Sequence, residues 1–192
     1  VMTPKPTEEE VVKYIKKWDL KENYVLQENS LNKLFGELIP QNKNIEDILL
    51  KCSTLNDFYS TNIFSIYSVA KHILYLNIDS RLSNGDLSLI EDIANVTING
   101  KKKRFYSFAT KYCSHHNNKD FPIYDSYVDK ILGYFRDLDC FCEFKKYELK
   151  DYKKFTEVLY EFKSFYKLEK FDLKDIDRYL WQLGKEYFPN NY

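Results

Sequence analysis

The stretch that decides the fold is residues 105–135, FYSFATKYCSHHNNKDFPIYDSYVDKILGYF. Its first part, 105–113, spaces apolar side chains as in a helix that buries one face. Pro122 then keeps the residue before it out of the helical conformation, so that Asp125 can cap a second helix. The stretch therefore predicts two helices joined by a short non-helical segment, and we expect the second to end at Gly133 or Asp137.

Helical spacing of apolar residues continues on both sides of this stretch. Before this stretch we expect a helix that begins at Thr7, two short helices on either side of a break at Pro40, a helix over 62–76, and a short helix after the turn at 84–86. After it we expect a helix over 150–168 and another over 173–188, with Asp172 as the cap of the last. Strand-like runs are limited to short ambiguous pieces such as 95–98, and a basic loop follows the helix that ends near Asn95. With about eight to ten helices, the sequence predicts an all-α fold in a single globular helical domain, residues 1–192.

Composition limits the class of protein. The chain is 44% hydrophobic and 30% charged, which excludes a disordered chain, and it contains no apolar run long enough to cross a membrane. It starts without a signal sequence, and its four cysteines are too few for a disulfide framework. We therefore expect a soluble cytoplasmic protein with free thiols.

Neither charge nor cysteine spacing indicates a cofactor. The pair Cys140 and Cys142 lacks the second pair that a zinc site needs, and no acidic ligands accompany His115 and His116, so we expect no metal and no cofactor. Basic and acidic residues are equal in number, at 29 each, so any nucleic-acid binding must depend on a local patch. The oligomeric state is left open.

The segment FPIYDSYV, 121–128, followed by Lys130-Ile131-Leu132, carries a family resemblance. It is similar to the Pro-x-x-Asp-x-x-Val segment that holds the catalytic aspartate of the helix-hairpin-helix DNA glycosylases, with the adenine-mismatch and 8-oxoguanine branches closest. A fainter similarity lies at 37–42, ELIPQN, which resembles the segment of that family with the general acid and strand-inserting residues. The resemblance implies two helical lobes that flank a groove lined by Asp125 and the basic run.

The resemblance also implies site residues. Asp125 matches the catalytic carboxylate, and Ser107 stands where lysine-using branches keep their nucleophile, with Lys111 one turn further as an alternative amine. At the start of a helix an aspartate is favoured in its charged form, which can stabilise positive charge on a deoxyribose as its base departs. The implied activity is cleavage of an N-glycosidic bond at a damaged or mismatched base.

Nucleic-acid contacts follow from cations and aromatic rings near these positions. The basic run, Lys101, Lys102, Lys103 and Arg104, precedes a helix and is expected to contact phosphate. Tyr106, Tyr124 and Tyr127 are candidate platforms on which a base can stack. The expected partner is nucleic acid, DNA first, with no membrane association.

Two departures from the family keep a second hypothesis open. The glycine-built hairpin, approximately Leu-Pro-Gly-Val-Gly, is replaced here by GKKKRF at 100–105, and the iron–sulfur cysteines of several branches are absent. Asp125 can also act as a helix cap alone, and the basic run as a solvated loop. The alternative is therefore a non-catalytic helical module that keeps the glycosylase fold and binds nucleic acid or a protein.

Overall fold

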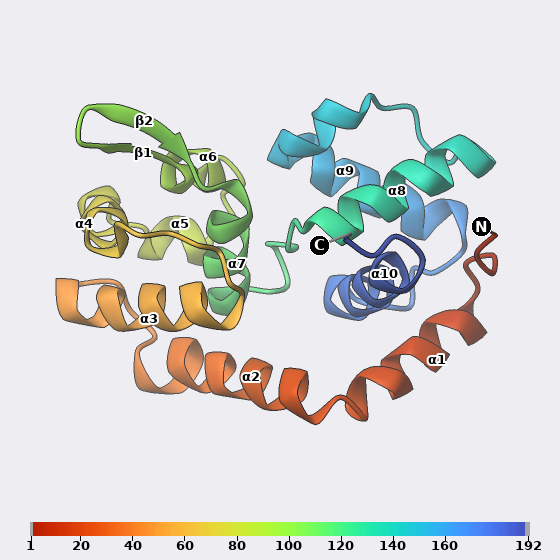
Figure 1. Ribbon diagram of the computed structural model, residues 1–192, viewed down its shortest axis with the longest axis horizontal. Helices are drawn as coiled ribbons and strands as arrows, with labels where there is room; N and C mark the ends of the chain where they lie inside the picture. The colour runs from red at the N-terminus through yellow and green to blue at the C-terminus, as the bar shows by residue number, and fades with distance from the viewer. Residues whose placement is uncertain (1, 191–192) are drawn as a thin grey trace. The chain divides into compact units, whose positions relative to one another are not determined.

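The computed structural model describes residues 2–190, which form two compact units (Figure 1). Unit 1 combines the chain up to Glu22 with the chain from Tyr124 onward, and unit 2 comprises Asn23–Ile123. Helices make up most of both units, which confirms the prediction of a mainly helical protein. None of the helices in the described residues is long and apolar enough to cross a membrane. The expectation of one domain for 1–192 stays a prediction.

Unit 2 is built from short helices and one β-hairpin. Its elements are α2 (Glu22–Asn32), a π-helical turn (Lys33–Leu38), α3 (Ile45–Phe58), α4 (Ile66–Leu76), α5 (Asp79–Ser83), α6 (Leu89–Ala94), β1 (Asn95–Ile98), β2 (Lys101–Arg104) and α7 (Tyr106–His116). Helix α3 packs against α4 and α7, and α6 packs against α7. Leu55, Ile73 and Ala109 are fully buried where these helices meet, so α3, α4, α6 and α7 form the core of the unit.

The expectation of a basic loop at 99–104 is wrong, because these residues form the turn and second strand of a hairpin. Strands β1 and β2 pair antiparallel, with Val96 opposite Lys103 and Thr97 opposite Lys102. Asn99 and Gly100 both have positive φ, 50° and 73°, as a two-residue hairpin turn of type I′ requires. Each strand has four residues, which is too short for a clear alternation of apolar and polar positions, but Asn-Gly is itself a strong hairpin signal.

Unit 1 joins the first helix to the last three. Its elements are α1 (Glu8–Asp19), α8 (Ser126–Asp139), a 3-10 turn (Lys146–Lys150), α9 (Tyr152–Phe165) and α10 (Leu173–Tyr187). Helix α10 packs against both α8 and α1. At Gly184 the backbone of α10 comes so close to the Tyr127 carbonyl of α8 that a Cβ would overlap it. Glycine at this position therefore permits close contact between α10 and α8.

Helix starts in unit 1 follow the sequence-based expectation, and one helix end does not. The side chains of Thr7 and Asp172 accept the backbone N–H groups of Glu10 and Asp175, which confirms both caps. The predicted end of α8 at Gly133 or Asp137 is wrong, because the helix continues to Asp139. Cys140 ends it in the left-handed conformation, a role that glycine or asparagine usually takes.

Candidate functional site

Asp125 is the N-cap of α8 in unit 1. Its backbone is extended, with φ −143° and ψ 151°, and its Oδ1 accepts the backbone N–H of Tyr127 at 2.8 Å. The side chain is half-buried. This geometry confirms the expected cap and holds the carboxylate at the positive end of a helix of 14 residues.

Ser107 and Lys111 lie one turn apart on α7, in unit 2. Ser107 is half-buried, and its carbonyl oxygen accepts the hydroxyl of Thr110 at 2.8 Å. Lys111 is buried, with its amine 4.6 Å from the ring centre of Tyr59. The structure thus places these two residues on one helix, whereas Asp125 belongs to the other unit. The groove implied by the resemblance stays a prediction.

The basic run occupies strand β2, and all four of its residues are exposed. Lys101, Lys102 and Lys103 have no acidic partner within the described residues, whereas Arg104 forms an ion pair with Glu91. The Arg104 guanidinium also lies 4.4 Å from the ring centre of Tyr106. Three cations on one short strand therefore remain available to an anionic ligand.

The three candidate tyrosines are engaged inside their own units. Tyr106 is buried below Arg104, and Tyr124 is buried with its hydroxyl donating to Asp129 Oδ2 at 2.6 Å. Tyr127 is half-buried, and its ring meets Trp181 edge-on at a centroid distance of 6.1 Å. Stacking of bases on these rings stays a prediction.

Exposed aromatic rings occur instead on and before α4, the helix that contacts β1 (Figure 1). Phe64 is 97% exposed, Tyr75 is 86% exposed and Tyr67 is 59% exposed. The Lys71 amine lies 5.3 Å from the ring centre of Tyr67. The sequence predicts Tyr67 as part of the apolar stripe of the helix at 62–76, but the structure leaves its ring exposed. The four-residue spacing of positions 67, 71 and 75 is the signal in the sequence for this surface.

A polar cluster inside unit 2 begins with Lys51, whose side chain is fully buried on α3. Its amine donates to the carbonyl oxygens of Ile39 and Gln41, at 3.1 and 3.0 Å, and lies 3.0 Å from Nε2 of His116. The two carbonyls follow the π-helical turn, where the chain leaves the helix. Burial lowers the pKa of Lys51 from 10.5 to about 8, although the neighbouring Asp79 opposes this shift.

Asn42 connects this amine to a carboxylate. Its backbone N–H and side-chain amide donate to Asp79 at 3.0 and 2.7 Å, and its amide oxygen accepts the hydroxyl of Tyr112. The same amide nitrogen lies 3.3 Å from Nε2 of His116. The hydrogen bonds from Asn42 and the charge of Lys43 keep the pKa of Asp79 below its usual range, although partial burial works against them.

His116 closes the cluster and lines a pocket of about 450 Å³, the α5–α7 pocket. Burial lowers the pKa of His116 to about 3, and the positive charge of Lys51 adds to this effect. The imidazole is therefore neutral at physiological pH. Asp79 and Ser83 of α5 line the same pocket, so a carboxylate and a neutral imidazole face one cavity.

The sequence contained partial signals of this cluster. Lys51 occupies the buried stripe of α3, between Ile48 and Leu55, where a charged side chain needs internal partners. The pair His115 and His116 is typical of a metal or acid–base site, whereas the structure places His116 in a hydrogen-bonded cluster with Lys51 and Asn42. The described residues contain no group of side chains able to hold a metal ion. Within the faintly similar segment 37–42, Asn42 is buried in the cluster and Glu37 is exposed.

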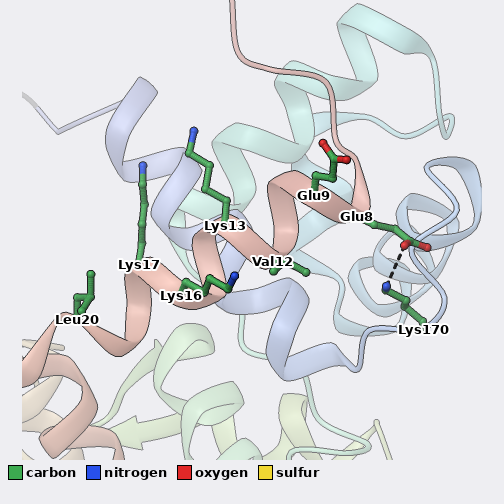
Figure 2. A pocket seen from close by; sticks show the side chains of 8 residues that line it. All are labelled: Glu8, Glu9, Val12, Lys13, Lys16, Lys17, Leu20 and Lys170. Atoms are coloured by element: carbon green, nitrogen blue, oxygen red, sulfur yellow. Dashed lines mark ion pairs between the residues drawn. The ribbon is translucent and has the colours of Figure 1, made fainter.

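A second basic surface lies in unit 1, along α1 (Figure 2). Lys13, Lys16 and Lys17 border a shallow groove of about 570 Å³, and Glu8 pairs with Lys170 at 2.8 Å at one end of it. Figure 2 shows Lys13 and Lys17 extending to the same side of the helix. The three lysines of α1 equal in number the three lysines of β2, so they are a natural control for charge effects.

Comparisons with known proteins define the family. A protein of Haemophilus influenzae, described as uncharacterised, is 53% identical over 148 residues, which cover 77% of this chain and 71% of the relative. No solved structure matches the chain. The family model HI_0787_N, described as an N-terminal domain, matches residues 10–120, a range that contains the hairpin and the whole buried cluster but not Asp125. The chain therefore belongs to the HI_0787_N family.

Proposed function

We propose that this protein binds nucleic acid, DNA first, through the β1–β2 hairpin, and that it recognises or acts on a damaged or mismatched base as a DNA glycosylase-like protein. In this proposal the two helical units correspond to the two lobes of the helix-hairpin-helix glycosylase arrangement. The exposed, unpaired lysines of β2 are the observation that carries it. In a chain whose charges balance, they supply the local patch that phosphate binding requires.

The hairpin has a suitable shape for this role. A two-stranded β-ribbon fits the major groove of DNA, and lysines on it neutralise phosphates and release counterions. The exposed rings of α4, which contacts β1, offer stacking surfaces for unpaired bases beside these cations. The hairpin thus takes the place of the glycine-built phosphate clamp that the sequence lacks.

The proposed chemistry assigns each candidate residue a part. Asp125, as a carboxylate held at the start of α8, stabilises positive charge on the sugar or activates a water during cleavage of the N-glycosidic bond. Ser107 occupies the nucleophile's position, and Lys111 is the reserve amine. The partial engagement of Asp125 in capping favours the second candidate function, a non-catalytic nucleic-acid-binding or protein-binding module of the same fold.

Salt-dependent binding tests the first half of the proposal. Each lysine that contacts a phosphate contributes about 0.9 to the slope of log K against log salt, so replacing Lys101, Lys102 and Lys103 by glutamine should reduce the slope on duplex DNA by about 3. The matched control replaces Lys13, Lys16 and Lys17 of α1, an equal change of charge in the other unit. Equal slopes for wild type and hairpin variant would reject the hairpin as the contact.

Release of a base from DNA tests the second half of the proposal, the glycosylase activity. Duplexes with mismatched or oxidised bases are incubated with wild type, with Asp125→Asn, and with Asp172→Asn, which alters the equivalent cap of α10. Release that is lost only in Asp125→Asn supports a catalytic carboxylate. Binding without release in all three proteins supports the non-catalytic module, and absence of both binding and release leaves a protein partner.

A further inference from the structure

The outer side of α4 and the turn before it carry a stripe of four residues, the α4 stripe: Phe64, Tyr67, Lys71 and Tyr75. Their spacing of three, four and four residues places them on one side of a helix, away from the residues that α4 buries. All three rings are exposed, whereas most aromatic side chains of the described residues are buried or half-buried. Neighbouring exposed rings of this kind mark an interaction surface.

The backbone holds Phe64 in a fixed position. The side chain of Asn56, on α3, accepts the backbone N–H of Ile63 at 3.0 Å and donates to the Ile63 carbonyl at 3.1 Å. Ile63 itself is buried, and the Ser65 carbonyl accepts the backbone N–H of Val69 where α4 begins. Phe64 therefore lies between two anchored residues while its ring is 97% exposed. Covering this ring with a ligand costs little backbone entropy, because the segment is already ordered.

Cations lie within the α4 stripe, at Lys71, and beside it on the hairpin. Lys103 is the cross-strand partner of Val96, and paired residues point to the same face of two strands. Lys101 is paired in the same way with Ile98, two positions further on. Val96 is buried, so both lysines belong to the face of the hairpin that turns toward the helices, and α4 is one of the helices that β1 contacts (Figure 1).

Acidic residues are absent from the two stretches that form this surface. Residues 58–78, which include α4, and residues 93–119, which include the hairpin, contain no Asp or Glu in a chain with 29 acidic residues. Helix α6 packs against both α4 and β1, and its two acidic side chains are each paired with an arginine. The surface thus combines exposed rings with positive charge, which fits a ligand that is both aromatic and anionic.

We propose that the α4 stripe and the hairpin together bind an unpaired segment of DNA, whose bases stack on the three rings while its phosphates contact Lys71 and the lysines of β2. This inference rests on the proposed function and names its substrate class. A single strand exposes the faces of its bases, so they can stack on aromatic side chains, whereas a double helix covers them. From Tyr67 to Tyr75 helix α4 rises about 12 Å, the length of about four stacked nucleotides at about 3.4 Å each.

The first test separates stacking from phosphate contact. Fluorescence anisotropy with the full chain measures the affinity for a labelled strand of about 12 thymidines and for an abasic strand with the same number of phosphates. Stacking of one base on an aromatic side chain accounts for about fivefold in affinity or more. The thymidine strand should therefore bind at least about fivefold more tightly than the abasic strand.

Substitution of single rings identifies the surface. Phe64→Ala and Tyr75→Ala should each weaken binding of the thymidine strand by about fivefold or more and leave binding of the abasic strand unchanged. Both rings are exposed, so thermal unfolding of these variants should match that of wild type. The matched control is Tyr160→Ala in unit 1, an exposed tyrosine that also has a lysine amine near its ring, at 5.7 Å, and it should bind both strands like wild type.

The outcomes distinguish this inference from the proposed function. Binding that is lost in the hairpin variant with three glutamines, but is equal for the two strands or survives both ring substitutions, would overturn the inference and leave DNA binding by the hairpin intact. Absence of salt-sensitive binding to both strands and to duplex DNA would overturn the inference and the proposed function together.

Discussion

Replacing His116 by glutamine should remove the acid sensitivity that this residue gives to unit 2. In the folded protein the pKa of His116 is lowered from 6.5 to about 3, first by burial and then by the charge of Lys51. The unfolded chain therefore binds a proton between pH 6.5 and 3 that the folded chain does not bind. The stability that this histidine confers is present in full above pH 6.5 and is lost as the pH falls toward 3.

The size of the expected loss of stability follows from the pKa shift of His116. Well inside this window each pH unit costs about 1.4 kcal/mol, so wild type should lose about 3 kcal/mol from this group between pH 7.5 and 4.5. Glutamine offers a carbonyl oxygen to the Lys51 amine but does not titrate. The free energy of unfolding of His116→Gln should be lower than that of wild type at neutral pH, and this difference should shrink by about 3 kcal/mol over the same interval.

Urea unfolding of both proteins at pH 7.5, 6.5, 5.5 and 4.5 measures this difference. Both tryptophans, Trp18 and Trp181, belong to unit 1, so their fluorescence reports on that unit. Deuterium uptake of peptides from α3 and α7 reports on unit 2. A difference between the two proteins that stays constant with pH would refute the assignment of His116 as a buried neutral group. Lys51→Met, which removes the neighbouring charge, should raise the pKa of His116 and reduce the acid loss.

Two further predictions concern packing and thiol chemistry. Gly184→Ala should destabilise unit 1 by about 1–3 kcal/mol, because the new methyl group overlaps the Tyr127 carbonyl, whereas Gly133→Ala, an open position within α8, should stabilise it by about 0.5–1 kcal/mol. Thermal unfolding of the two variants measures whether each one stabilises or destabilises the unit. Equal changes in stability would contradict the close contact between Gly184 and the Tyr127 carbonyl. At pH 8 the exposed thiol of Cys140 should react with a maleimide, whereas burial raises the pKa of Cys52 to about 12 and should protect it. Mass spectrometry of labelled peptides identifies the modified residue, and early labelling of Cys52 would argue against a closed core.

Local signals in the sequence predicted most of the helices of this protein, but not α5 or the first part of α2. Thr7, Asp125 and Asp172 were expected as caps because a cap involves only the next three residues, and all three accept the expected kind of hydrogen bond. The hairpin was not predicted, because strands of four residues show no clear periodicity, although the turn sequence Asn99-Gly100 is a hairpin signal.

Local signals in the sequence could not predict contacts between residues that are far apart in the chain. The bond between Lys51 and His116 joins positions 65 residues apart, and that between Asn42 and Tyr112 joins positions 70 apart. No linker composition marks the change of unit near Tyr124, since the chain passes from one unit to the other within a few residues before a capped helix. Periodicity reports which face of a helix is buried but not which distant side chain meets it.

The discontinuous make-up of unit 1 has a consequence for how the protein folds during synthesis. Tyr14 of α1 donates a hydrogen bond to Glu186 of α10, a partner 172 positions later, so this part of unit 1 can form only after α10 has left the ribosome. Unit 2, continuous from Asn23 to Ile123, can fold while translation continues, and N-terminal regions generally fold first. Until α10 is available, the apolar face of helix α1 stays exposed to solvent. To fold, unit 1 must therefore close a long loop and form contacts of high contact order, and both of these slow folding. During that time the nascent chain is exposed to chaperones.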